Sequence, residues 1–262
     1  MTTLFELRPG DSPLIFSVPH AGTDLPADIE ARLTPHARTL PDTDWHVEQL
    51  YDFAPQLGAG MIRANVSRYV IDLNRPPEDE SLYPGQATTG LCPPIEFDGT
   101  PIYLDGGSVP EEEVARRRAA YWQPYHDALA AEIARVKARH GYALLYDCHS
   151  IASRVPRLFS GTLPDLNLGT VKGESCAPGL QTAIEQVMQA SGLTQVSNGR
   201  FVGGYITRQY GKPREDVHVV QMEKGQDCHL MDDGSTRLDP AKVAKLKPVL
   251  RRIAEAMLAW RP

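Results

Sequence analysis

The sequence predicts an α/β domain with a mixed, largely parallel central sheet and helices on both faces of that sheet. Short continuous apolar runs, typical of strands buried on both faces, recur along the chain. Segments with helical signals alternate with these runs, which favours strand–helix–strand units over an all-α or all-β fold. Most of the apolar runs stop at polar residues, as expected where a ligand site lies beyond the carboxyl ends of the strands.

The apolar runs predict the strands one by one. The predicted strands cover residues 14–18, 61–66, 69–73, 143–146 and 217–222. The first is followed at once by Pro19 and His20, and the 69–73 run is followed by Asn74 and Arg75. The two later runs stop at residues 147–150 and 223–225, which are again polar or glycine.

Four segments carry helical signals. Residues 44–57 have apolar side chains at helical spacing, and residues 177–190 end near Gly192. The clearest helix runs from Pro110 to His140, because a proline opens it, three glutamates follow in its first turn and Gly141 ends it. We expect Pro124 to kink this helix or divide it. A C-terminal helix should begin at 239–240 and run to about residue 260.

One stretch differs in composition from the rest. Residues from about 76 to 108 are rich in proline and glycine and have little periodicity. A structureless segment of that length inside a compact domain is often a lid or a binding loop. With no repeat and no linker in the sequence, we expect a single domain over residues 1–262 that carries this loop insertion.

Composition excludes several classes of protein. The 262 residues have a net charge of −6 and no basic stripe, which argues against nucleic acid as a partner. No apolar run reaches the roughly 18 residues of a membrane span, and no signal-peptide pattern is visible at the start. The four cysteines are widely spaced and form no Cys-x-x-Cys pair, which favours free thiols in a cytoplasmic protein. Composition does not determine the oligomeric state.

The residues at the predicted strand ends suggest a metal-dependent hydrolase. Two histidines and one carboxylate form a catalytic zinc set that leaves one position open for water. His20 and His149 are the candidate nitrogen ligands, and Asp44 is the candidate oxygen ligand. Asp44 could equally cap the helix that follows it, and Asp42 is then the alternative ligand. One Zn²⁺ per chain suits these ligands, although Mn, Co or Fe could occupy an N/O site.

Further side chains suit the remaining roles in hydrolysis. Glu223, at the end of an apolar run, is the candidate general base, with a salt bridge to Lys224 as its alternative role. Arg68 is the candidate for stabilising the charge on the reacting oxygen. Arginine binds carboxylates as a planar fork, and two separate arginine sites would suit a small substrate with two carboxylates. The candidates for that binding are Asn74, Arg75 and Arg208, each arginine alone being more often part of a structural ion pair.

Other catalytic motifs are absent from the sequence. There is no HExxH, GxSxG, Walker A or GxGxxG pattern. Cys148 stands beside His149, but neighbouring residues on a strand point to opposite faces. We therefore expect Cys148 to be a buried small side chain rather than a thiol nucleophile.

Five short motifs occur along the chain from about residue 16 to 225. The motifs are SVPHAG at 17–22, DTDW at 42–45, SRYVIDLNR at 67–75, YDCHS at 146–150 and QME at 221–223. Taken together and in this order, they resemble the motifs of the N-formylglutamate amidohydrolase family. The resemblance implies a phosphorylase/hydrolase-like fold of the zinc exopeptidase type and a zinc ion. It also implies hydrolysis of N-formyl-L-glutamate to formate and L-glutamate, a step of histidine degradation.

The resemblance assigns roles residue by residue. His20, Asp44 and His149 match the metal positions, and Glu223 matches the base of the related carboxypeptidases. The Asn74–Arg75 pair resembles the pair that holds a substrate α-carboxylate in those enzymes, which leaves Arg208 for the side-chain carboxylate. One position departs from the carboxypeptidase pattern, because Thr23 stands where they place a glutamate ligand. Asp24 is therefore a further alternative to Asp44 as the carboxylate ligand.

The predicted mechanism follows from these assignments. Glu223 deprotonates the water that attacks the formyl carbon and then protonates the leaving amine, while zinc and Arg68 stabilise the oxyanion. A related zinc-dependent deacylase or γ-glutamyl peptide hydrolase is an alternative enzyme with the same metal site. A non-catalytic binder of acidic metabolites is an alternative of another class.

Overall fold

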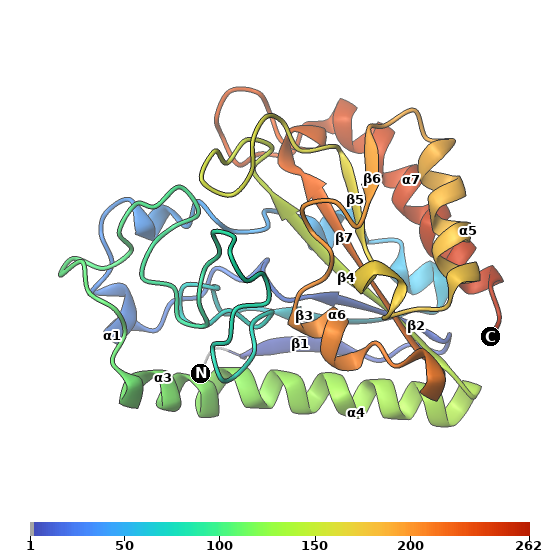
Figure 1. Cartoon of the computed structure of the whole chain (residues 1–262), viewed down its shortest axis with the longest axis horizontal. Helices are drawn as coiled ribbons and strands as arrows, with labels where there is room; N and C mark the ends of the chain where they lie inside the picture. The colour runs from blue at the N-terminus through green and yellow to red at the C-terminus, as the bar shows by residue number, and fades with distance from the viewer. Residues whose placement is uncertain (1–2) are drawn as a thin grey trace.

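Seven strands form one sheet in the order β1-β3-β2-β4-β7-β5-β6 (Figure 1). This computed structural model describes residues 3–262. The strands are β1 Phe5–Arg8, β2 Leu14–Val18, β3 Gly60–Ala64, β4 Ala143–Ile151, β5 Leu166–Gly169, β6 Gln195–Ser197 and β7 Val217–Gly225. The predicted strands at 14–18, 143–146 and 217–222 are confirmed, and the last two continue to residues 151 and 225.

The centre of the sheet is parallel. Strands β3, β2, β4 and β7 are neighbours that run in the same direction, so their carboxyl ends meet at one edge. The edge strand β1 runs antiparallel to β3, and β5 runs antiparallel to β7. The prediction of a mixed, largely parallel sheet is therefore confirmed, and the edge where the four central strands end is the place to look for a site.

Helices cover both faces of the sheet. Figure 1 shows α3 and α4 along one side, with α5 and α7 on the other. The α-helices are α1 Ala27–Glu30, α2 Val47–Leu50, α3 Glu111–Arg117, α4 Gln123–His140, α5 Pro178–Gln189, α6 Tyr205–Tyr210 and α7 Pro240–Ala259. A π-helical turn, η3 Arg118–Trp122, joins α3 to α4. Short 3-10 turns are η1 Ala37–Thr39, η2 Ala54–Leu57, η4 Val171–Gly173, η5 Pro213–Glu215 and η6 Gln226–Cys228.

Alternation along the strands divides the core into two clusters, one on each face. On β4, Leu144, Tyr146 and Cys148 belong to the cluster with α5 and α7, whereas Ala143 and Leu145 belong to the cluster with α4. This period of two is what strand geometry requires of a sheet buried on both sides. Beyond Leu145, the α4 side of the strand continues with Asp147 and His149, so its polar end lies on one face.

The predicted strand at 69–73 is wrong. Residues 68–70 form a turn, and the segment has no strand assignment, although Tyr69, Val70, Ile71 and Leu73 are buried in the α4-side core. Arg117 explains how an irregular segment can be buried, because its Nη1 donates to the carbonyl oxygens of Val70 at 3.0 Å and Tyr69 at 3.4 Å. A side chain thus satisfies backbone groups that a neighbouring strand would otherwise pair.

Two helix predictions need adjustment. The helix expected over 44–57 is reduced to α2 and η2, which residues 51–53 separate. Pro55, in the first turn of η2, has no N–H for a helical hydrogen bond back to this gap. The helix expected over 110–140 begins and ends where predicted, with Gly141 in the left-handed conformation at φ +84°. Pro124 is accommodated by the wide turn η3 just before it rather than by a break. The helices at 177–190 and 239–260 are confirmed as α5 and α7.

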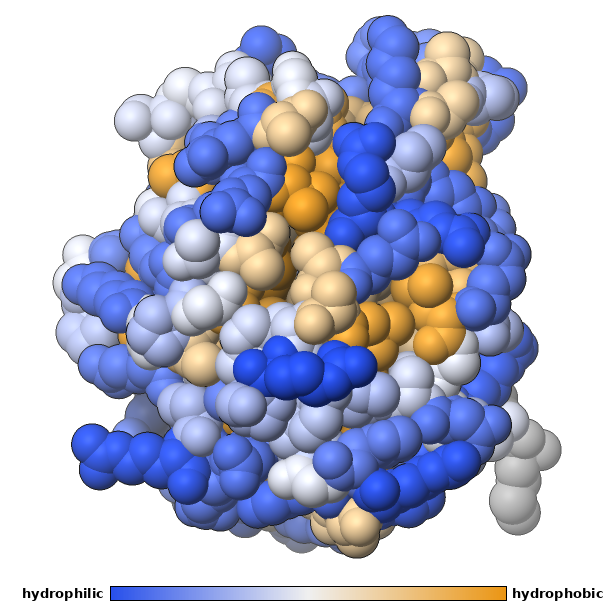
Figure 2. Space-filling model, turned by 90° about the vertical axis from the view of Figure 1, so that its right-hand side faces the viewer, coloured by the Kyte–Doolittle hydropathy of each residue, from blue (hydrophilic) through white to orange (hydrophobic). Residues whose placement is uncertain are grey.

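The proline- and glycine-rich segment is irregular throughout. Residues 76–108, all of which the structure describes, contain turns, bends and isolated bridges. Within residues 3–262, no helix has the length and apolar character needed to cross a membrane. On the face that carries α5 and α7, apolar side chains reach the surface in patches interrupted by hydrophilic ones (Figure 2).

Candidate active site

The site is built first by the pairing of β4 with β7. His149 and Glu223 are register partners on these parallel strands, as are Asp147 and Gln221. Partners in register point to the same face, and residues two apart on one strand do so as well. The four side chains therefore form a polar group at the carboxyl end of the α4-side face.

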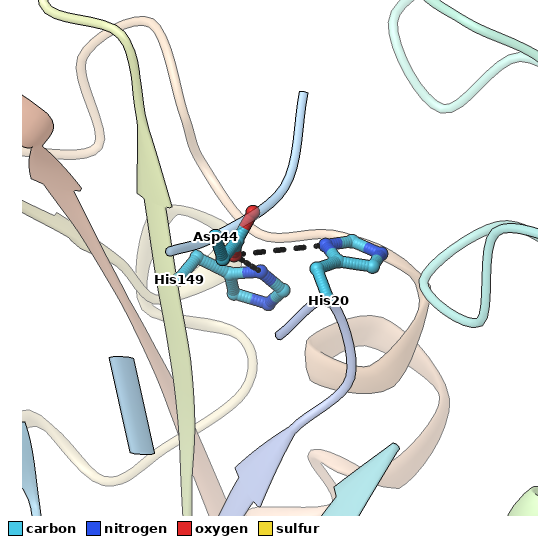
Figure 3. A group of neighbouring side chains, drawn as sticks. All are labelled: His20, Asp44 and His149. Carbon is cyan, nitrogen blue, oxygen red and sulfur yellow. Dashed lines mark hydrogen bonds and ion pairs between the residues drawn. The ribbon is translucent and has the colours of Figure 1, made fainter. Parts of the chain in front are cut away.

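The loops after β2 and before α2 complete the metal-ligand set. His20 follows β2 directly, and Asp44 lies just before α2 with its backbone N–H donating to the carbonyl oxygen of His20 at 3.1 Å. Figure 3 shows dashed contacts that run from the carboxylate of Asp44 to both imidazole rings. Its Oδ2 lies 3.2 Å from Nδ1 of His149 and 3.8 Å from Nδ1 of His20. The potential ligand atoms of the three buried residues all lie within 4.8 Å of one another.

A second carboxylate orients each imidazole. Nε2 of His20 lies 2.7 Å from Oδ1 of Asp72, and Nε2 of His149 lies 2.8 Å from Oδ2 of Asp147. When each Nε2–H donates to its carboxylate, each Nδ1 is left with a lone pair directed at the Asp44 side. Carboxylate–histidine pairs of this kind fix the tautomer of metal-binding histidines. The donor set therefore fits a divalent metal ion.

The pKa values of the two histidines are shifted in opposite directions, that of His20 downward and that of His149 upward. Burial, together with the nearby Arg68 guanidinium, lowers the pKa of His20. Burial also opposes protonation of His149, but the carboxylates of Asp147 and Asp44 outweigh it and raise its pKa to about 10. The negative charge of two carboxylates therefore gathers around His149, which is an electrostatic environment that suits a metal cation.

Among the three carboxylates that the sequence left open, the geometry selects Asp44. Its Oδ2 also accepts the backbone N–H of Ser150 at 3.0 Å, and α2 is preceded by His46 rather than capped by Asp44. Asp42 uses its Oδ2 to accept the N–H of Phe97 at 2.9 Å. Asp24 lines a different surface hollow, whose lining includes Trp45 but neither His20 nor His149.

Glu223 lines the same pocket as His20, Asp44 and His149. Burial of its carboxyl group, with the negative charge of Asp44 nearby, raises the pKa of Glu223 to about 7. No hydrogen bond or ion pair engages this carboxylate among residues 3–262. The alternative salt bridge with Lys224 does not form, because Nζ of the buried Lys224 donates instead to the carbonyl oxygen of His149 at 2.6 Å.

Arg68 links the two carboxylates on the His20 side of the site. Its Nη2 donates to Asp72 at 2.8 Å, and its Nη1 lies 3.5 Å from Oδ1 of Asp44. Its guanidinium also stacks on the ring of Phe97, with Cζ 4.6 Å from the ring centroid. Arg68 lines the pocket and is nearly buried, so its positive charge is available to a bound ligand in a poorly solvated environment.

Of the three predicted substrate-binding residues, two line the pocket and one does not. Asn74 and Arg75 line the pocket, but the Asn74 side chain is already engaged, accepting the N–H of Ile206 at 2.8 Å and donating to Asp147 at 3.3 Å. Arg208 is not one of the pocket-lining residues, and its Nε donates to the carbonyl oxygen of Gly203 at 3.0 Å.

The sequence analysis missed Arg200, which lines the pocket. Arg200 follows β6, which is parallel to β5 and therefore runs opposite to the central strands. A search for functional residues at the carboxyl ends of parallel strands does not reach it. Cys148, as expected, is fully buried in the core on the opposite face from His149.

Comparisons with known proteins identify the family to which this chain is similar. A sequence profile described as N-formylglutamate amidohydrolase matches residues 12–230. A protein of Pseudomonas aeruginosa described as N-formylglutamate deformylase is 49% identical, covering 99% of this chain and 98% of the relative. A Pseudomonas putida protein of the same description is 44% identical, covering 99% and 97%.

Solved structures show the same fold. The crystal structure of N-formylglutamate amidohydrolase from Ralstonia eutropha matches with a TM-score of 0.80 and 29% identity, over 96% of this chain and 97% of that one. The Agrobacterium tumefaciens gene product Atu2144 matches with a TM-score of 0.75 over 98% and 96% of the two chains. At 16% identity, this second match bears on the fold alone.

Proposed function

Because the chain belongs to the N-formylglutamate amidohydrolase family, we propose that it hydrolyses N-formyl-L-glutamate to formate and L-glutamate with the help of one divalent metal ion. The observation that carries the metal-dependent mechanism is the buried group of His20, Asp44 and His149, with Glu223 lining the same pocket. Zn²⁺ is the proposed ion, because two imidazoles and one carboxylate form a set that catalytic zinc sites use.

The protein's own residues would hold and orient the metal. His20 and His149 would each offer Nδ1 while their Nε2–H groups donate to Asp72 and Asp147. Asp44 would supply the oxygen ligand, held by the Ser150 N–H. When bound, a divalent ion polarises a carbonyl group and makes water more acidic.

Glu223 would move the proton in the reaction. A base with a pKa near the working pH can both accept a proton and return it, and burial brings the pKa of Glu223 to about 7. Its ionised carboxylate would take a proton from the water that attacks the formyl carbon. The same group would then pass that proton to the departing amine of glutamate, which leaves Glu223 ionised for the next turnover.

Two arginines next to the site would have separate roles. The Arg68 guanidinium would stabilise negative charge developing on the formyl oxygen, and it also holds Asp44 and Asp72 in place. Arg75 lines the pocket and would bind a substrate carboxylate. Asn74 would contribute by positioning Asp147 and the N-terminus of α6.

The four cysteines are free thiols, three of them buried, which suits work in a reducing cytoplasm. In that compartment the reaction would serve histidine degradation, as the family resemblance implies. The proposed mechanism does not depend on the cellular location or on the pathway.

Formate release tests this function. Purified protein is supplied with N-formyl-L-glutamate, N-formyl-L-aspartate and N-acetyl-L-glutamate, with and without a chelator. We expect formate from N-formyl-L-glutamate, loss of that activity on chelation and recovery when Zn²⁺ is added back. Activity that survives complete metal removal would contradict the proposed mechanism, and a preference for N-acetyl-L-glutamate would favour a general deacylase.

A further inference from the structure

We propose that Arg75 and Arg200 form a dicarboxylate-binding pair in which Arg75 holds the α-carboxylate and Arg200 holds the distal carboxylate of the substrate. The inference rests on the proposed function, because it concerns how the same pocket selects an acidic N-formyl amino acid. Arg200 would be a specificity-determining residue that the sequence pattern does not reveal.

The first support is the position of the two side chains. Both arginines line the pocket that contains His20, Asp44, His149 and Glu223. Arg75 comes from the segment after the buried 69–73 turn, and Arg200 comes from the loop between β6 and α6. They approach each other closely enough that the charge of Arg75 contributes to the lowered pKa of Arg200, after the larger effect of burial.

The second support is that neither arginine has an acidic partner within residues 3–262, in contrast to Arg68. Arg75 donates to the carbonyl oxygens of Thr89 at 2.8 Å and Asn74 at 3.1 Å, and to Oγ1 of Thr89 at 3.2 Å. Arg200 donates only to the carbonyl oxygens of Leu158 at 2.8 Å and Ala87 at 3.0 Å. A guanidinium has about five N–H donors, so both retain free donors.

The charges of Asp72 and Glu223 act on Arg75 and Arg200 respectively, but neither guanidinium forms an ion pair with a carboxylate within residues 3–262. Two like charges in one pocket that lack such direct partners favour the binding of an anionic ligand. A single carboxylate would neutralise only one of them, whereas a molecule with two carboxylates would neutralise both. The pocket is therefore matched in charge to an aliphatic dicarboxylate, the class to which N-formylglutamate belongs.

The neighbours of the two arginines indicate which substrate carboxylate each of them binds. Arg75 adjoins Asn74, which donates to Asp147, the partner of His149. Arg200 donates to the carbonyl oxygens of Leu158 and Ala87, which are half-buried loop residues lining the same pocket, whereas Asn74 is buried. In an N-formyl amino acid the α-carboxylate is next to the carbon that bears the amide, while the side-chain carboxylate lies further away. Arg75 is thus placed for the first and Arg200 for the second.

Aromatic rings hold Arg200 in this position. Its Cζ lies 5.3 Å from the ring centroid of Tyr83 and 5.2 Å from that of Phe201. Tyr83 belongs to the irregular 76–108 segment, and its hydroxyl donates to the carbonyl oxygen of Gly203 at 3.0 Å. That segment therefore forms the wall against which Arg200 packs. Arg208 contacts the same ring from outside the pocket, with its Cζ 5.7 Å from the centroid.

The test compares substrates that differ only in the distal charge. Wild type and Arg200→Gln are given N-formyl-L-glutamate and its uncharged analogue N-formyl-L-glutamine. We expect Arg200→Gln to lose roughly 10- to 100-fold in kcat/KM on N-formyl-L-glutamate, the range of a charge-assisted hydrogen bond, and no more than about threefold on N-formyl-L-glutamine. Equal loss on both substrates, or no loss on either, would overturn the proposal.

Three further variants sharpen the comparison. Arg200→Lys keeps a positive charge without the planar fork, so the ratio of kcat/KM for N-formyl-L-glutamate to that for N-formyl-L-glutamine should fall by about tenfold or less. This variant provides the test if Arg200→Gln is unstable. Arg208→Gln tests the residue that the sequence favoured, and loss of the preference there instead of in the Arg200 variants would overturn the proposal. Arg214→Gln changes an exposed arginine in η5, before the amino end of β7, and should match wild type.

Binding of a simple diacid separates this proposal from the proposed function. In calorimetric titrations with glutarate, which has the carboxylate spacing of glutamate, wild type should bind and Arg200→Gln should bind at least about tenfold more weakly. Wild type that binds glutarate but releases no formate would contradict the proposed function while supporting the arginine pair. Equal glutarate affinity in wild type and Arg200→Gln, or no affinity in wild type, would contradict the pair.

Discussion

His149 and Glu223 are register partners on the adjacent parallel strands β4 and β7, so their side chains lie side by side on one face of the sheet. This pairing places a candidate metal-binding imidazole and a buried carboxylate on one face of the sheet, without help from any loop. Both strands extend past the apolar runs that predicted them, to Ile151 and Gly225. The relative placement of the proposed ligand and the proposed base is therefore set by two paired strands at the centre of the sheet.

The first prediction concerns Glu223. Glu223→Gln removes the proton acceptor but keeps the size of the side chain, so kcat should fall by at least about 100-fold while metal content is unchanged. Formate release and metal analysis of the same preparation measure both. Glu255→Gln, on the exposed face of α7, is the matched control and should retain full activity. Activity of Glu223→Gln near that of wild type would remove Glu223 from its role.

The second prediction is a pH dependence. Burial raises the pKa of Glu223 from the ordinary 4.5 to about 7, and only the ionised form can accept a proton. A bound cation would lower this pKa again, so kcat/KM should rise with pH through an apparent pKa between those two values. A pH–rate profile measured with saturating metal shows this limb. Activity that increases as the pH falls from 7 to 4 would contradict the assignment of Glu223 as base.

The third prediction concerns the carboxylate behind His149. Asp147→Asn keeps the shape of the side chain but weakens the hydrogen bond that orients Nε2 of His149. Metal affinity should fall about 10- to 100-fold, as measured by competition with a chromogenic chelator. Asp127→Asn, on the exposed side of α4, should leave affinity unchanged. Unaltered affinity in Asp147→Asn would show that this contact does not tune the metal site.

The fourth prediction concerns stability in acid. Burial lowers the pKa of His126 from 6.5 to about 4, and its Nε2 lies 2.9 Å from the carbonyl oxygen of Leu73. Between these two pH values the unfolded chain binds a proton that the folded chain does not. The free energy of unfolding should therefore fall by up to about 3 kcal/mol from this group as the pH drops from 6.5 to 4.

The comparison with His126→Gln isolates that contribution. Denaturant unfolding of both proteins is followed across the pH range, and the metal-site histidines titrate equally in each. The variant should be less stable at pH 7 but lose less stability on acidification. If the free energies of unfolding of the two proteins fall in parallel with pH, His126 does not make the predicted contribution to the acid dependence of stability.

The central strands were predictable because their signals are local, and the same signals indicated the candidate metal ligands. A continuous apolar run identifies a buried strand, and the polar residues that follow it lie at the common edge. This reasoning indicates His20, His149 and Glu223 as candidates, and the structure brings them to one pocket. Asp44 precedes a helix and was left undecided between ligand and cap. The loop before α2 decides between these roles. In that loop the backbone N–H of Asp44 donates to the carbonyl oxygen of His20, and this contact brings the Asp44 carboxylate next to both imidazole rings.

The parts that were missed depend on distant residues. The 69–73 segment has the composition of a strand, but the buried Arg117, far along the chain, satisfies its carbonyl groups in a turn. Strands β1, β5 and β6 are only three or four residues long and too short to show a clear alternation. Arg200 has no motif around it, and its place in the pocket follows from strand direction and from Tyr83.

Metal stoichiometry tests the centre of this account most directly. Wild type and the variants His20→Ala, Asp44→Ala and His149→Ala are dialysed against buffered Zn²⁺ and analysed by atomic spectroscopy, with circular dichroism to confirm folding. We expect about one ion per wild-type chain and a small fraction of that in each folded variant. Folded variants that all keep a full complement of metal would show that these three residues do not bind it.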